Sequence, residues 1–189
     1  MQKTSYYIIN GITWYRLIMA PVLIILLFVD RVDIFKWLLP VSFFTDAIDG
    51  YLARKYKVTS IFGSRLDSIG DDLTVLAGVV GLIVWKPGFF LDHLWPLIVL
   101  ALLFAIQVTL ALRKYKKTTS FHTYAAKLAA IAQGVFLILF FLIPDLPTYG
   151  FYIAAAITAI DLVEEIILVF VLPKWEANVK GLYWVLKKD

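Results

Sequence analysis

The sequence contains no cysteine and few charged residues, and both shortages limit the kind of protein it can encode. Without cysteine, neither a disulfide framework nor a zinc site with thiolate ligands can form. Only 17% of the 189 residues are charged and 61% are hydrophobic, against roughly 25% and 45–50% in average globular chains. Polar and low-complexity linkers are also missing, so we expect one domain over residues 1–189.

The hydrophobic residues gather into six segments, each near the ~20 residues that are needed to cross a bilayer. These segments cover residues 9–29, 34–54, 62–85, 93–112, 124–144 and 149–172. The sequence therefore predicts an all-α polytopic membrane protein with six transmembrane helices. Residues 173–189 are too polar and too short to cross, and their tryptophans, tyrosine and lysines favour a segment in the membrane interface. A loosely ordered tail is the alternative.

The basic residues predict how the six segments are oriented. Fourteen of the 18 Lys and Arg residues fall at the two termini or around the connectors near residues 55–60 and 113–120. An even number of spans places these four regions on one face, and the excess of positive charge marks that face as cytoplasmic. We therefore read the net charge of +4 as membrane topology, with no nucleic-acid partner.

Four aspartates lie in the second and third hydrophobic segments, where a carboxylate is costly and calls for a functional explanation. Asp46 and Asp49 are three residues apart, and Asp67 and Asp71 are four apart, so each pair shares one face of a helix. Helices joined by a short loop pack antiparallel, which lets the two faces meet. Four unpaired carboxylates would repel one another, and hard divalent cations such as Mg²⁺ or Mn²⁺ remove that repulsion.

The residues around these aspartates fit a site for a diphosphate. Gly50, Ala53 and Gly63 remove bulk from the same helix faces, and Arg54 supplies a planar cation suited to phosphate oxygens. Taken singly, each has a simpler explanation. Small residues often serve helix packing, an arginine can anchor a helix at the interface, and an intramembrane aspartate can relay protons.

The eight positions together resemble the signature of the CDP-alcohol phosphotransferase family, D-x2-D-G-x2-A-R-x8-G-x3-D-x3-D. They are Asp46, Asp49, Gly50, Ala53, Arg54, Gly63, Asp67 and Asp71. The first segment is also similar to that of many members, with Asn10, Thr13, Arg16 and Pro21.

The resemblance implies a membrane enzyme that uses a CDP-linked donor such as CDP-diacylglycerol. Asp46, Asp49, Asp67 and Asp71 would hold one or two divalent ions on its diphosphate. The other four signature residues, Gly50, Ala53, Arg54 and Gly63, would shape the CDP pocket. Asp71 would act as general base on the acceptor hydroxyl, and CMP would leave. The resemblance further implies a homodimer in a bacterial inner membrane.

The sequence indicates the donor through the signature, but it gives weaker evidence for the acceptor alcohol. Glycerol 3-phosphate is our leading interpretation, with serine and inositol phosphate open. A phosphorylated acceptor needs cations, and Arg113 and Lys127 are the candidates that resemble segments of phosphatidylglycerophosphate synthases. Lys127 could equally reach to the interface by snorkelling. The sequence departs from many of those synthases at Ser68, Asp72 and Gln107.

Three acids in the last hydrophobic segment, Asp161, Glu164 and Glu165, allow other readings. They would disfavour a nearby phosphate and favour an amine, or they pair with a cation such as Arg16 or Lys127. Two other classes of protein also stay open. A small cation or proton-coupled carrier would use the intramembrane acids for transport, and an assembly protein would need no catalytic aspartate.

Overall fold

The computed structural model describes residue 15 and residues 18–56, 61–143 and 148–187, and gives only the backbone of residues 46, 47, 49–56 and 61–68. The described part consists of helices and irregular connectors, and the one bridge among the described residues joins Ser120 to Ala177. The chain divides into two compact units, Met1–Leu91 and Asp92–Asp189.

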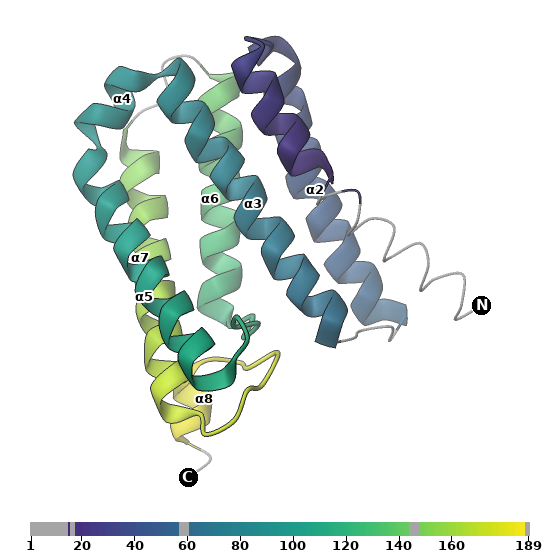
Figure 1. The fold of residues 1–189 in the computed structure, drawn as a ribbon, viewed down its shortest axis with the longest axis vertical. Coiled ribbons are helices and arrows are strands. Elements are labelled where there is room, and N and C mark those ends of the chain that lie inside the picture. The colour runs from purple at the N-terminus through teal and green to yellow at the C-terminus, as the bar shows by residue number, and fades with distance from the viewer. Residues whose placement is uncertain (1–14, 16–17, 57–60, 144–147, 188–189) are drawn as a thin grey trace. The chain divides into compact units, whose positions relative to one another are not determined.

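The first unit contains the helix Ile18–Phe28, α2 (Val32–Tyr56) and α3 (Ile61–Trp85). Figure 1 shows α2 and α3 side by side, and residues of the two helices are in contact. Their connection, residues 57–60, is short enough to force an antiparallel pair. Where the first helix meets α2, Asp30 adopts a left-handed conformation and its carboxylate accepts a hydrogen bond from the Trp85 indole at 3.1 Å.

The core of this unit is apolar and lies along the facing helices. Leu23, Phe35 and Leu39 are fully buried, and Leu82 is 1% exposed. The Phe35 ring meets the Trp85 ring edge to face, with 5.1 Å between centroids. This burial explains why apolar residues recur at helical spacing on α2 and α3.

The second unit is built on three long helices: α5 (Leu94–Tyr115), α6 (Tyr124–Leu142) and α7 (Tyr149–Val171). The short α4 (Pro87–Asp92), which belongs to the first unit except for Asp92, comes before them, and α8 (Leu182–Leu186) follows. Helix α7 packs against both α5 and α6. The Gln133 amide donates to the Thr158 hydroxyl at 2.8 Å, which ties α6 to α7.

Two of the described helices, α5 and α6, are long and apolar enough to cross a membrane. Helix α7 is of similar length but carries Asp161, Glu164 and Glu165. The all-helical prediction is confirmed for the described residues, and the two apolar helices indicate a membrane protein. The prediction of six transmembrane helices stays a prediction, although the second to sixth segments each form a helix within a few residues of the expected bounds.

The tail after α7 is ordered, so the alternative of a loosely ordered tail is wrong for residues 173–187. The Trp175 indole donates to the Thr118 carbonyl at 2.9 Å, and the Asn178 N–H donates to the Ser120 carbonyl at 3.2 Å. Phe121 of the connector is fully buried and Val179 of the tail is 8% exposed, in one apolar cluster with the ends of α5 and α7. The tail therefore packs on the α5–α6 connector.

A buried polar network fixes the same connector to α7. Gln107 of α5 is 3% exposed, and its amide donates to the Glu165 carboxylate at 2.6 Å and to the Thr119 hydroxyl at 2.5 Å. That hydroxyl in turn donates to the same Glu165 oxygen at 3.0 Å. An acid in an apolar helix is stabilised by such donors, because an unpaired buried carboxylate would be costly.

Replacing Thr119 by valine tests this network. The Thr119→Val variant keeps the side-chain volume but leaves the Gln107 amide and the Glu165 carboxylate each short of a partner. We expect it to lower the free energy of unfolding by about 1–3 kcal/mol. Thermal unfolding in detergent measures the effect.

The neighbouring threonine provides a matched control. The Thr118 hydroxyl is buried and has no hydrogen-bond partner among the described residues. Thr118→Val should therefore leave the melting temperature unchanged or raise it slightly. Equal destabilisation by the two substitutions would contradict the network.

Candidate functional site

The eight signature positions lie on two neighbouring helices of one unit. Helix α2 carries Asp46, Asp49 and three of the small or basic positions, and α3 carries Gly63, Asp67 and Asp71. Among these eight residues the structure describes only the side chain of Asp71, which is partly buried. The side chains of Asp46, Asp49, Gly50, Ala53, Arg54, Gly63 and Asp67 lie outside the described part.

The helix bounds give the distance of each aspartate along its helix from the end that leads into the α2–α3 connection. Asp49 comes seven residues before the end of α2 at Tyr56, and Asp67 comes six residues after the start of α3 at Ile61. Both positions are thus about 10 Å along their helices from the connected ends, at 1.5 Å per residue. Asp46 and Asp71 each lie ten residues from those ends, or about 15 Å. In an antiparallel pair, the aspartates therefore occupy two matching levels.

The donor set at these levels suits a hard cation. Aspartates are oxygen ligands, and Mg²⁺ and Mn²⁺ prefer oxygen. Among the described side chains, no group of three or more His, Asp or Glu could hold a metal ion. The acids of α7 therefore form no such site. The four-aspartate metal site stays a prediction, because three of its members lie outside that comparison.

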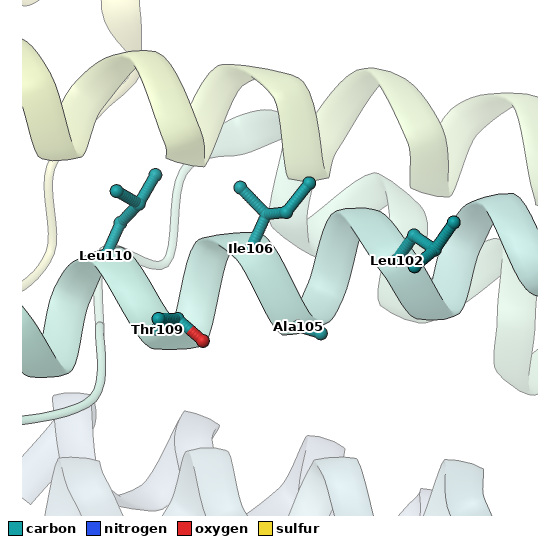
Figure 2. Close-up of a pocket in the computed structure, with 5 residues that line it drawn as sticks. All are labelled: Leu102, Ala105, Ile106, Thr109 and Leu110. Atoms are coloured by element: carbon teal, nitrogen blue, oxygen red, sulfur yellow. The ribbon is translucent and has the colours of Figure 1, made fainter.

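One hollow among the described residues is unsuited to a diphosphate. It measures about 330 Å³ and is lined by residues of α5 alone. Figure 2 shows these residues along the helix: Leu102, Ala105, Ile106, Thr109 and Leu110. Their spacing places them on adjacent positions of an α-helical surface, and one hydroxyl is the only polar side-chain group. Such a lining offers neither metal ligands nor cations.

The basic residues at the end of α5 differ in their contacts. Some contact other groups of the second unit, and others are exposed at the surface. Lys114 donates to the carbonyls of Val169 and Phe170 at 2.8 and 3.2 Å, where it caps the end of α7. Lys117 stands over the Trp175 ring, 5.2 Å from its centroid. Arg113 is exposed, which leaves its guanidinium accessible to an anion. The predicted role of Arg113 as an acceptor ligand stays a prediction.

Lys127, the second candidate for the acceptor, lies on the first turn of α6. Its ammonium is 5.2 Å from the centroid of the Tyr124 ring, and the side chain is exposed. This contact fits a lysine that extends along an aromatic ring toward the interface. It leaves the predicted acceptor role untested.

Two of the three acids of α7 have hydrogen-bond partners that sequence spacing did not indicate. Glu165 belongs to the network with Gln107 and Thr119, and Glu164 accepts a hydrogen bond from the Leu182 N–H at 2.9 Å. Asp161 keeps one buried carboxylate oxygen without a partner among the described residues. Arg16, one of the cations expected to pair with these acids, lies outside the described part. The one available signal for the network was Gln107, an amide within an apolar helix.

Comparison with known protein families gives a match that covers most of the chain. A family described as CDP-alcohol phosphatidyltransferase matches residues 6–171 of this chain. No solved structure matches the chain significantly.

Curated relatives match over a shorter stretch. A CDP-diacylglycerol–glycerol-3-phosphate 3-phosphatidyltransferase of Haemophilus influenzae is 32% identical over 84 residues, which are 42% of this chain and 45% of that protein. Proteins of the same name from Rickettsia typhi and Rickettsia prowazekii are each 35% identical over 80 residues. That stretch is 41% of this chain and 44% and 43% of those proteins, so the match spans less than half the length of each relative.

Proposed function

The chain belongs to the CDP-alcohol phosphatidyltransferase family, and from this premise we propose that it transfers a phosphatidyl group from CDP-diacylglycerol to glycerol 3-phosphate. CMP is the second product. The observation that carries the donor half is the complete signature of residues 46–71, whose aspartates fall at matching levels of α2 and α3. The names of the curated relatives support glycerol 3-phosphate as acceptor.

The donor site consists of the signature residues of the first unit. Asp46, Asp49, Asp67 and Asp71 would hold one or two Mg²⁺ or Mn²⁺ ions, whose charge neutralises the diphosphate and makes CMP a better leaving group. Arg54 would bind a phosphate oxygen, since its planar fork matches phosphate geometry. The small residues Gly50, Ala53 and Gly63 would admit the CDP group close to the helix backbones.

The transfer step exchanges one phosphorus–oxygen bond for another. The acceptor hydroxyl oxygen attacks the β-phosphorus of CDP-diacylglycerol, and the bond from that phosphorus to the CMP oxygen breaks. Asp71 takes the proton from the attacking hydroxyl as general base. Its partly buried position on α3, one turn from Asp67 in the helix, supports this role.

A phosphorylated acceptor needs cations close to its phosphate. Arg113 is exposed at the end of α5 and would bind the phosphate of glycerol 3-phosphate, with Lys127 as a second cation. Serine and inositol phosphate are the other acceptors open to the same chemistry.

We further propose that residues 1–189 form one membrane domain with six transmembrane helices, as a homodimer. The extent of the family match, residues 6–171, supports one domain, and α5 and α6 support membrane insertion. The basic termini and connectors orient both ends and the active site toward the cytoplasm. A bacterial inner membrane fits this orientation and the bacterial relatives.

A CMP-release assay tests the proposed function. Purified protein receives CDP-diacylglycerol, Mg²⁺ or Mn²⁺, and either glycerol 3-phosphate, serine or inositol phosphate. We expect CMP only with glycerol 3-phosphate, and we expect EDTA to stop its release until Mg²⁺ or Mn²⁺ is restored. CMP release with a different acceptor would correct the acceptor alone. No CMP with any acceptor, together with ion flux in liposomes, would favour a carrier instead.

The role of Asp71 can be separated from donor binding. Asp71→Asn should lower kcat by at least about a hundredfold, because an amide cannot accept the acceptor proton. Binding of CDP-diacylglycerol, measured by retention of radiolabelled donor, should stay close to wild type.

Asp72→Asn is the matched control for this substitution. Asp72 is the next residue along α3, is exposed and falls outside the signature. Its variant should keep wild-type kcat. Wild-type turnover in Asp71→Asn would remove the general-base role.

Arg113 offers a test of the acceptor site. Arg113→Gln should raise KM for glycerol 3-phosphate about tenfold or more, as expected for loss of a hydrogen bond to a charged group. The KM for CDP-diacylglycerol should not change. Lys116→Gln, which alters an exposed cation at the end of the same helix, is the control. An unchanged KM for the acceptor in Arg113→Gln would exclude Arg113 from the acceptor site.

A further inference from the structure

A continuous row of aromatic rings and lysines runs over the surface of the second unit. Lys127 stands over the Tyr124 ring, Tyr124 contacts Trp184, Trp184 contacts Tyr183, and Lys187 stands over Tyr183. The four centroid distances are 5.2, 5.2, 5.5 and 5.8 Å in that order. We call these five residues the aromatic–lysine row. It joins the first turn of α6 to α8, which lie 60 residues apart in the sequence.

The row is exposed although its residues are large and partly apolar. Tyr124, Tyr183 and Trp184 are 55%, 64% and 42% exposed, and both lysines are exposed as well. Leu186 and Leu128, the apolar residues next to the lysines at its two ends, are 57% and 55% exposed. Soluble proteins rarely expose a contiguous apolar patch to water. A patch of this kind therefore indicates a surface that binds another molecule or a membrane.

The backbone beneath the row is held in place. The Tyr124 N–H donates to the Lys180 carbonyl at 3.2 Å, and the Trp184 N–H donates to the Gly181 carbonyl at 3.2 Å. Glu164 of α7 accepts from the Leu182 N–H at 2.9 Å, which anchors the start of α8. Gly181 has a φ of 148°, a conformation that favours glycine. The surface is therefore preformed.

The charge and position of the row identify its partner. Its two formal charges are both positive, and the tail adds Lys174 and Lys180 against a single described acid, Glu176. The row begins where α6, one of the two helices apolar enough to cross a membrane, starts its apolar run. Tyrosine and tryptophan favour the boundary between lipid and water, and lysines there attract anionic headgroups.

We propose that the aromatic–lysine row is a binding surface for the headgroups of anionic phospholipids. The rings would lie at the level of the glycerol backbone, and the ammonium group of Lys187 would bind a lipid phosphate. Charge complementarity favours an anionic over a zwitterionic lipid at this surface. Such a surface would enrich acidic lipid around the second unit independently of the transfer step.

Lipid retention measures this preference directly. The full chain is reconstituted in nanodiscs that contain equal amounts of phosphatidylcholine and phosphatidylglycerol, and is then extracted in mild detergent. Mass spectrometry of the co-purified lipid gives the ratio of phosphatidylglycerol to phosphatidylcholine. We expect enrichment of phosphatidylglycerol for the wild type and about a fivefold lower enrichment for Lys187→Gln. Tyr183→Ser should lower the total lipid retained.

Lys86→Gln is the matched control, because Lys86 is an exposed lysine outside the row. Its lipid ratio should equal that of the wild type. Lys127 is left unchanged because of its proposed acceptor role. The proposal is overturned if Lys187→Gln retains wild-type enrichment, if Lys86→Gln loses as much, or if the wild type shows no preference. Phosphatidylglycerol held at the donor site would contribute equally to all variants, so a failed transfer assay leaves this test valid.

Discussion

The cost of a carboxylate in an apolar helix is the constraint on which the account of this protein depends. Four aspartates on α2 and α3 would repel one another and would take up protons unless a cation lay between them. Divalent metal ions would satisfy that requirement and would at the same time bind the diphosphate of the proposed donor. Two antiparallel helices are enough to bring four aspartates into such an arrangement. Counted from the connected ends of α2 and α3, the aspartates lie at two matching distances along the helices.

The second unit meets the same constraint in a different way. Two of its three acids on α7 are held by neutral donors: Glu165 by Gln107 and Thr119, and Glu164 by a backbone N–H of α8. Hydrogen bonds of this kind stabilise an acid without leaving it free to bind a metal ion. Glu165 and Glu164 therefore serve structure, in that they fasten the α5–α6 connector and the tail. The basic connector that would receive an anionic acceptor is consequently held in a defined conformation.

Local sequence patterns predicted most of the described helices. They could not predict the contacts between residues that are far apart in the sequence. Apolar runs of 62–85 and 149–172 predicted α3 and α7 closely, because helix formation follows from local periodicity and length. The signature aspartates stood out because their spacing is itself a local pattern. The packing of the tail on the connector and the partners of Glu165 depend on which helices become neighbours. Residues 46 to 58 apart in sequence meet in that network, and no local pattern specifies the meeting.

The central claim is that the aspartates of α2 and α3 form one cation site, and binding of Mn²⁺ tests it most directly. Electron paramagnetic resonance of purified protein titrated with Mn²⁺ reports the bound ion without any need for turnover. The account predicts that wild type and Asp72→Asn bind Mn²⁺ alike, and that Asp46→Asn and Asp67→Asn, on different helices, each weaken binding strongly. Unchanged Mn²⁺ binding in both Asp46→Asn and Asp67→Asn would contradict a metal site shared by the two helices.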